Sequence, residues 1–166
     1  MLNLYKIACV TVLCLACTTA LASDEELGLL ELFNYYEYSP QLASSGQPDR
    51  TQFVAIAAAG VRTVINLAPK TAPNAIADEG DLVRGLNMAY VHIPIDWEAP
   101  QQAEVEKFLT AMEAVGDQPV LVHCYANARA SAFVYLYRVL RLRHDRDVAR
   151  ATLISIWDLN EGYEFS

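Results

Sequence analysis

The segment VLVHCYANARASAF, residues 120–133, joins a strand-like apolar run to a helix-like apolar run through a short turn of small residues. The run that ends at His123 has the β-branched composition of a buried strand, and the run from Arg129 onward is typical of an apolar helix. A turn that leads from a strand into a helix lies at the carboxyl end of the sheet, where open α/β folds bind ligands. The segment therefore indicates an α/β fold with a site at the turn from Cys124 to Arg129.

The rest of the chain alternates between strand-like and helix-like segments. Buried strands are predicted at residues 61–67, 88–95 and 118–123, with a further short strand weighed near 41–45. A first helix, capped by Asp49 or Thr51, should end at Gly60, and further helices are predicted over 78–85, 101–115, 129–143 and 145–159. Strands separated by helices predict a compact α/β fold with a mainly parallel central sheet of about four strands flanked by helices. The aromatic-rich stretch 28–40 is assigned to no element.

Length and charge limit the domain organisation and the partners. A chain of 166 residues that is 54% hydrophobic can bury one core, so residues 23–166 are expected to form a single domain. The net charge of -8 argues against nucleic acid as a partner and provides no basic tract for an anionic membrane surface. The three histidines, His92, His123 and His144, have no ligand-like spacing, so neither a metal nor another cofactor is expected.

The first 22 residues have the pattern of a secretory signal peptide. Lys6 precedes an apolar run too short to span a bilayer comfortably, and Ala-Leu-Ala before Ser23 offers a cleavage site. The sequence therefore predicts export, to the periplasm, with no stable membrane insertion after cleavage. A membrane anchor or a buried first helix is the alternative, and lipid attachment at Cys17 is a weaker one.

Cleavage after residue 22 would leave Cys124 as the single cysteine, because Cys9, Cys14 and Cys17 lie in the removed segment. A lone thiol risks oxidation in an oxidising compartment, so its presence there calls for a reason. One reason is structural, since free cysteine often serves as a small buried hydrophobe. The other is chemical, and the residues that follow Cys124 favour it.

The turn after Cys124 has the composition of an anion-binding cradle. Its backbone N–H groups and the positive end of the following helix would stabilise the Cys124 thiolate and lower the pKa of the thiol. Arg129 adds a planar fork that suits two oxygens of a bound phosphate or similar oxyanion. Asn127 tolerates the positive φ that a tight cradle requires.

The other predicted substrate-binding residues are sequence neighbours of Cys124, Asn127 and Arg129. Small side chains would leave room for the ligand, Tyr125 belongs to the same turn, and His123 would hold the loop by hydrogen bonds of its ring. Ser131 would donate its hydroxyl to the sulfur, or act as an ordinary residue of the first helical turn. The small residues in question are Ala126, Ala128 and Ala130.

Several motifs together resemble one known family. The patterns SGQP, G.RTVINL, Y.HIPI.WEAP and VHCYANARASAFVYLYRVL are similar to the bacterial protein tyrosine and dual-specificity phosphatase-like domain that also occurs in beta-lactamase-hydrolase-like proteins. The resemblance covers residues 40–160 and implies a compact cysteine-phosphatase fold. It implies Cys124 as nucleophile, Arg129 as phosphate clamp, and a general acid on the IPIDWEAP loop. Asp96 matches that position best, and Glu98 is the reserve.

One departure from the family pattern leaves the activity open. The usual phosphatase signature has about five residues between cysteine and arginine, whereas Tyr125–Ala128 are four. A short loop is also a feature of rhodanese-type sulfurtransferases, in which the cysteine carries a persulfide. The sequence therefore leaves three functions open. They are a phosphatase acting on a phosphorylated protein or small molecule, a sulfurtransferase, and a non-catalytic module that binds an oxyanion.

Overall fold

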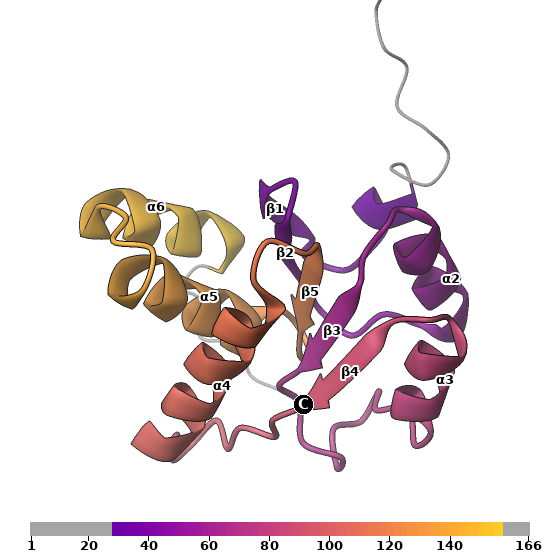
Figure 1. The fold of residues 1–166 in the computed structure, drawn as a ribbon. Coiled ribbons are helices and arrows are strands. Elements are labelled where there is room, and N and C mark those ends of the chain that lie inside the picture. Colours follow the sequence, from indigo (N-terminus) through magenta and orange to yellow (C-terminus); the bar gives the residue numbers. More distant parts are fainter. Residues whose placement is uncertain (1–27, 158–166) are drawn as a thin grey trace, which may run out of the picture.

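A five-stranded sheet forms the centre of the molecule in the computed structural model, which describes residues 28–157 (Figure 1). The strand order is β1-β2-β5-β3-β4, and all neighbours are parallel except β1 and β2. The mainly parallel α/β fold predicted from the sequence is confirmed. The strands are β1 (Tyr36–Ser39), β2 (Leu42–Ser45), β3 (Thr63–Asn66), β4 (Ala89–His92) and β5 (Val120–His123).

The sheet has one strand more than the four expected. The additional strand, β1, pairs antiparallel with β2 at the edge of the sheet and is formed by the residues YEYS. Three of its four residues are half-buried and one is exposed, so it lacks the alternation by which an edge strand is recognised. The expected signal peptide, residues 1–22, lies outside the described residues.

Helices connect the strands at the places that the sequence indicated. Asp49 caps α2, where its carboxylate accepts hydrogen bonds from the amides of Thr51 and Gln52, and Asp145 caps α6 in the same way. The helices are α2 (Arg50–Ala58), α3 (Glu79–Gly85), α4 (Gln102–Val115), α5 (Ala128–Leu140) and α6 (Arg146–Ile156). No helix in residues 28–157 has the length and apolar character needed to cross a membrane.

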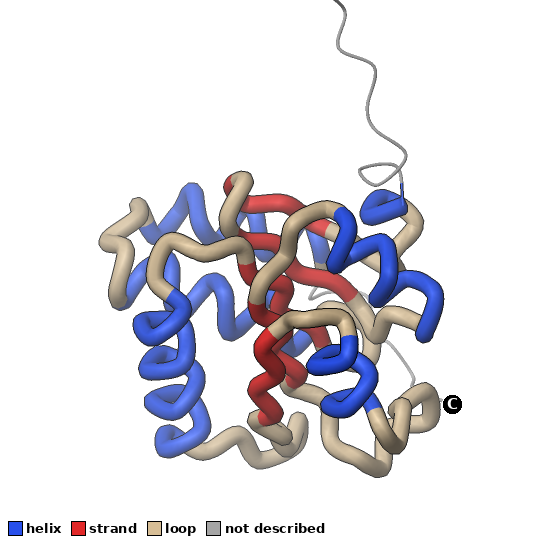
Figure 2. The backbone as a smooth tube through the Cα atoms, turned by 45° about the vertical axis from the view of Figure 1, so that its right-hand side comes forward, coloured by secondary structure: helices blue, strands red, loops and turns tan. Residues whose placement is uncertain are grey.

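Helices cover both faces of the sheet (Figures 1 and 2). On one face α4 and α5 bury Phe108 and Phe133, whose rings meet edge to face with centroids 5.5 Å apart. On the other face α2 and α3 bury Phe53 and Val83. Successive residues of β3 and β5 point to opposite faces and so divide between these two cores. The three-layer packing holds the strand ends in fixed positions.

The carboxyl ends of the four parallel strands form one row. Ser45 of β2 pairs in register with His123 of β5, which pairs with Asn66 of β3, which in turn pairs with His92 of β4. Because β5 lies in the middle of the sheet, the turn that follows His123 emerges at the centre of this row. The sheet topology therefore places Cys124 and Arg129 between the loops that follow the neighbouring strands.

Candidate active site

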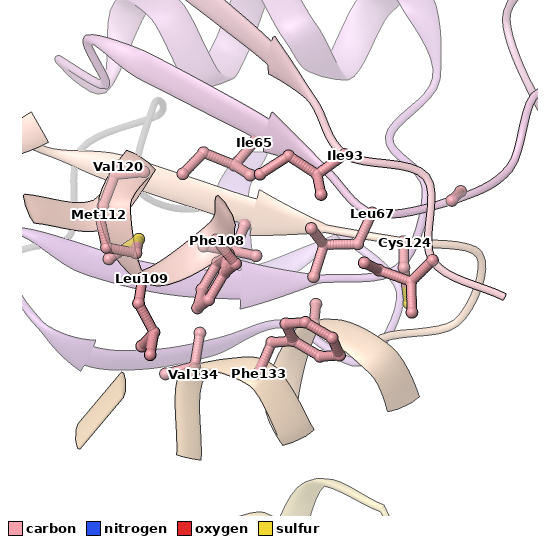
Figure 3. Packing of buried hydrophobic residues seen from close by; sticks show 14 of the residues in the cluster. Ile65, Leu67, Ile93, Phe108, Leu109, Met112, Val120, Cys124, Phe133 and Val134 are labelled. Carbon is pink, nitrogen blue, oxygen red and sulfur yellow. The ribbon is translucent and has the colours of Figure 1, made fainter. Parts of the chain in front are cut away.

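Cys124 lies at the end of β5 and is almost completely buried, with 1% of its surface exposed. Its amide donates to the Ser45 carbonyl at 3.3 Å, and the Leu67 amide donates to the His123 carbonyl at 2.8 Å, so both neighbouring strands hold the start of the turn. Figure 3 shows the Cys124 side chain beside Leu67 at the edge of the core cluster. The sulfur therefore occupies one fixed position at the beginning of the turn.

Two carbonyl groups of the turn point away from its centre and accept hydrogen bonds from neighbouring segments of the protein. The Tyr125 carbonyl accepts from the Gln47 amide at 3.1 Å, and the Ala126 carbonyl accepts from Asn34 Nδ2 at 3.2 Å. An isolated antiparallel bridge between Gly46 and Ala126 further ties the turn to the segment after β2. The first amides of α5 have no acceptor within the helix and give its start a positive potential.

Asn127 gives the turn its curvature. Its φ of 72° is in the left-handed region, as the sequence predicted, and it directly precedes α5. Its side-chain amide donates to the Asn34 carbonyl at 2.5 Å, while Asn34 Nδ2 donates to the Ala126 carbonyl. The two asparagines thus bind the turn to the segment before β1, a connection across more than ninety residues.

Arg129, on the first turn of α5, carries two hydrogen-bond donors that have no acceptor. Its Nε and Nη1 atoms are both buried, and neither has a hydrogen-bond partner in the described part of the chain. Trp97 lies over the guanidinium, with 5.9 Å between Cζ and the ring centroid. Buried guanidinium donors without acceptors fit the oxygens of an oxyanion, which a guanidinium binds through its planar fork of N–H groups.

A pocket of about 310 Å³ opens at Arg129. Trp97 and Tyr125 provide aromatic surfaces, and the loop after β3 provides the other side. Among the residues 28–157 that the structure describes, Arg129 is the one charged residue in its lining, which otherwise consists of Pro69, Thr71, Ala72, Pro73, Trp97 and Tyr125. The pocket therefore combines one fixed positive charge with an apolar, largely aromatic wall.

The two candidate general acids lie on the loop between β4 and α4. Asp96 and Glu98 are both exposed, and Asp96 Oδ1 accepts from the Glu98 amide at 3.0 Å. Neither belongs to the lining of the pocket, but Trp97 between them does. The loop therefore reaches the site through Trp97 and carries a carboxylate on the residue before Trp97 and on the residue after it.

The small residues of the turn pack into the protein rather than lining the pocket. Ala126 and Ala128 are buried in a cluster with Trp157, and Ala130 belongs to the main core. The Ser131 hydroxyl donates to the backbone carbonyls of Asn127 at 2.7 Å and Ala128 at 3.1 Å. These alanines were expected to leave space for a ligand. In the structure they instead allow the turn and α5 to pack closely against the protein. Ser131 therefore has the second of its two expected roles, that of an ordinary residue in the first helical turn.

A buried polar network behind the turn was missed by the sequence analysis. His123 Nε2 lies 3.1 Å from Glu79 Oε1, which also accepts from Asn66 Nδ2 at 2.7 Å and the Tyr90 hydroxyl at 2.9 Å. Gln47 Nε2 donates to the other carboxylate oxygen of Glu79. The sequence signals were His123, whose ring was expected to form hydrogen bonds, and SGQP, the motif that contains Gln47. Glu79 had no signal of its own, since it is one of three acidic residues in ADEGD.

The pKa of Glu79 is lowered by these neighbours. Burial acts to raise the pKa of this carboxyl group, which is 2% exposed, but the hydrogen bond and positive charge of His123 and the hydrogen bonds from Gln47 and Tyr90 outweigh it. Burial and the charge of Glu79 raise the pKa of Tyr90. Glu79 is therefore a carboxylate, and Tyr90 a phenol, at neutral pH.

Gly46 allows the segment after β2 to approach the turn, and this yields a stability prediction. A Cβ atom at Gly46 would lie 2.9 Å from Phe33 Cδ1 and 3.1 Å from the Tyr125 carbonyl oxygen. We expect Gly46→Ala to lower the free energy of unfolding by about 1–3 kcal/mol, measured by urea denaturation. Gly85→Ala is the matched control, because a Cβ at Gly85 meets nothing within 4 Å. Equal stability of the two variants would contradict this account of Gly46.

Comparisons with known proteins agree with this geometry. Residues 37–158 match the family described as DSP-PTPase phosphatase fused to NAD+ kinase. A beta-lactamase hydrolase-like protein of Xylella fastidiosa is 31% identical over 118 residues, which are 69% of this chain and 27% of that protein. The chain therefore spans about a quarter of the length of the curated relatives it matches.

Solved structures with the same fold are also phosphatases by description. A DUF442 phosphatase from Shewanella putrefaciens CN-32 is 41% identical, with a TM-score of 0.73 over 80% of this chain and 86% of that one. TpbA of P. aeruginosa, solved in complex with pTyr, shares the fold at 22% identity, with a TM-score of 0.62 over 81% and 76% of the two chains. The matched residues span the sheet, the turn at Cys124 and Arg129 on α5, and the chain belongs to the family of DSP-PTPase-like phosphatases.

Proposed function

We propose that this protein is a cysteine-dependent phosphatase that hydrolyses phosphomonoesters through a phosphocysteine intermediate. The observation that carries the proposal is the unsatisfied pair of buried donors, Nε and Nη1, on Arg129. Leaving buried donors without acceptors costs free energy, and an oxyanion bound by the guanidinium would offset this cost. Arg129 is five positions beyond Cys124, on the first turn of the helix that follows it, so the bound anion would lie within reach of the sulfur.

The reaction consists of two displacements at phosphorus. The Cys124 thiolate attacks the phosphorus atom and forms the S–P bond as the P–O bond to the leaving group breaks, and Asp96 or Glu98 gives a proton to the departing oxygen. Arg129 and the amides of the turn stabilise the phosphoryl oxygens during transfer. Water then attacks the phosphocysteine and gives a proton back to the same carboxylate, the S–P bond breaks, and inorganic phosphate and the thiolate are released.

The pocket favours a phosphate ester of an aromatic alcohol. Its wall includes Trp97, Tyr125 and two prolines, and Arg129 is the only cation that the described part of the chain contributes to it, so it offers one phosphate site beside a mainly apolar surface. A substrate with several phosphates would need further positive charge. TpbA, which shares the fold, was solved in complex with pTyr, and this supports an aryl phosphate as the first substrate to test.

Trapping the intermediate on Cys124 tests the proposal directly. The protein is mixed briefly with an aryl phosphate, quenched in acid, and Cys124 is analysed by mass spectrometry, with Cys124→Ser as control. Release of phosphate together with a phosphorylated Cys124 is expected. The same experiment with thiosulfate tests the sulfurtransferase alternative that the four-residue turn suggests. A gain of one sulfur atom on Cys124 without any phosphate release would overturn the phosphatase proposal.

The role of the acidic loop gives a second test. We expect Asp96→Asn to lower kcat by about 10²- to 10⁴-fold for an alkyl phosphate, because the alkoxide leaving group needs a proton. The loss should be far smaller for a nitrophenyl ester, whose leaving group is stable as an anion. Glu98→Gln, on the other side of Trp97, is the matched comparison. If both variants turn over alkyl phosphates like the parent protein, neither carboxylate is the general acid.

A further inference from the structure

The two edges of the sheet differ in how they are protected. At one edge, β1 carries the exposed charge of Glu37, and its register with β2 is irregular between Glu37 and Ser39. Arg138 also lies over the ring of Tyr38, with 5.2 Å between Cζ and the ring centroid. Charges and irregular pairing of this kind discourage another strand from adding to a sheet. The other edge, β4, has the sequence AYVH, without lysine, arginine, carboxylate, proline or a break in its register with β3, and so lacks these protections (Figure 1).

Backbone hydrogen-bonding groups of β4 face this open edge. The amides of Ala89 and Ile93 donate to carbonyl groups of the β3 segment, at 2.8 and 2.9 Å. Successive amides of a strand point to alternate edges, so the N–H and C=O groups of Tyr90 and His92 point outward. Among residues 28–157, β4 pairs only with β3, and no other segment bonds to the backbone of Tyr90 or His92. The edge therefore offers two donors and two acceptors to a further strand.

A hollow lies on each face of the β4 edge. On the α4 face, Val91 and Ile93 border a groove of about 530 Å³. On the α3 face, Tyr90 and His92 line a pocket of about 460 Å³. Side chains of a paired strand alternate between the faces as those of β4 do, so an added strand would direct its side chains alternately into the groove and the pocket. The rest of the groove lining comes from α4 and consists of Ala103, Glu106, Lys107, Thr110 and Ala111.

The groove and the pocket suit different side chains. Aliphatic residues of β4 and alanines of α4 border the groove, so it fits an apolar side chain. In the pocket, the two exposed carboxylates, Asp78 and Asp81, are already paired with Arg50 and Arg84. Lys70 is also exposed in the pocket lining, and it has no ion-pair partner in the described part of the chain. A segment in which acidic and apolar residues alternate is therefore complementary to this edge.

We propose that the outer edge of β4 is a docking site for an extended peptide segment of a protein substrate, which adds to the sheet as a further strand. In antiparallel pairing, one peptide residue exchanges both hydrogen bonds with Tyr90, and the next but one does so with His92. The peptide residue between them lies opposite Val91 and enters the groove. Main-chain hydrogen bonds would supply the affinity, and the two hollows would select the side chains.

The docking edge leads to the candidate active site. β4 continues directly into the loop that carries Asp96 and Trp97, and Pro69 borders both the α3-face pocket and the pocket at Arg129. An antiparallel peptide has its amino-terminal side at the carboxyl end of β4, so the phosphorylated residue precedes the docking segment in the substrate. This use of the edge in turnover rests on the proposed function, whereas binding of the segment does not.

The probe is a synthetic peptide that contains phosphotyrosine, a spacer and the segment Glu-Val-Glu. A spacer of about four residues, the separation of His92 and Asp96 in the chain, spans roughly 13 Å when extended. In the antiparallel register both glutamates donate their N–H groups to β4, whereas the N–H of the valine points away. We expect N-methylation of one glutamate to lower kcat/KM about ten-fold, and N-methylation of the valine to change it by less than about two-fold. Equal effects of the two methyl groups would show that no strand is added.

A variant of the groove tests the same site from the side of the protein. Ala103→Arg places a long charged side chain in the groove from an exposed position of α4. The ratio of kcat/KM for the phosphopeptide to kcat/KM for a nitrophenyl phosphate should fall about ten-fold. Gln102→Arg is the matched control, because Gln102 is the exposed neighbour that does not line the groove, and it should keep the ratio of the parent. A ratio that also stays the same in Ala103→Arg would contradict docking in the groove.

Hydrogen exchange in the parent protein separates docking from catalysis. With a saturating amount of the unphosphorylated peptide, the amides of Tyr90 and His92 should exchange about ten-fold more slowly than in the free protein. Unchanged exchange would overturn the docking site even if the phosphopeptide were hydrolysed. Slower exchange in a protein that hydrolyses no ester would disprove the proposed function and keep the docking site. If the parent is a dimer that protects these amides without peptide and loses the protection on dilution, a second copy occupies the edge and the proposal is wrong.

Discussion

Cys124→Ser is expected to reduce the turnover of aryl phosphates by about 10⁴-fold or more, because the hydroxyl of serine is a far weaker nucleophile than a thiolate. The turn offers serine no base: the side chain at position 124 is 1% exposed and lies at the edge of the apolar core, beside Leu67. Steady-state kinetics with a nitrophenyl phosphate would measure the effect.

Binding should survive the loss of turnover in this variant. Arg129 and the amides of the turn are unchanged in Cys124→Ser, so inorganic phosphate should bind within a few-fold of its affinity for the parent, measured by calorimetry. Turnover within ten-fold of the parent would show that Cys124 is not the nucleophile. Loss of phosphate binding together with turnover would instead indicate that the substitution disrupts the turn.

Arg129→Lys is expected to lower kcat/KM for aryl phosphates by about 10²- to 10³-fold, although it keeps the positive charge. The reason is geometric. Nε and Nη1 of Arg129 are buried without acceptors and the guanidinium lies near the ring of Trp97, so its planar fork of donors is oriented, whereas an ammonium group offers no such fork. Lysine would also change the cation–π contact with the indole ring of Trp97.

Arg141→Lys is the matched control for this prediction. Arg141 caps the other end of the same helix and pairs with Glu106 and Glu113 on the surface, and these pairs raise the pKa of its guanidinium. Its replacement should leave kcat/KM unchanged. If Arg129→Lys retained the activity of the parent, a point charge would be sufficient, and the two-donor clamp would be wrong.

Local patterns predicted most of the fold and the residues on the turn. The helix cap at Asp49, the buried strands and the positive φ of Asn127 all follow from the preferences of residues close together in the chain. β1 was missed because its four residues at the sheet edge are held by pairing with β2, not by their own pattern. The order of the strands, with β5 central, likewise depends on contacts between distant segments.

What surrounds the turn was decided only by the tertiary structure. The sequence by itself determined that Cys124 ends a buried strand and that Arg129 opens the next helix, because strand, turn and helix signals are local. It did not indicate that Asn34 holds Asn127 from 93 positions away, or that Glu79 meets His123 across 44 positions. Such partners are chosen by the packing of the layers, and nothing distinguishes Glu79 from its acidic neighbours until α3 is placed against the ends of β3, β4 and β5.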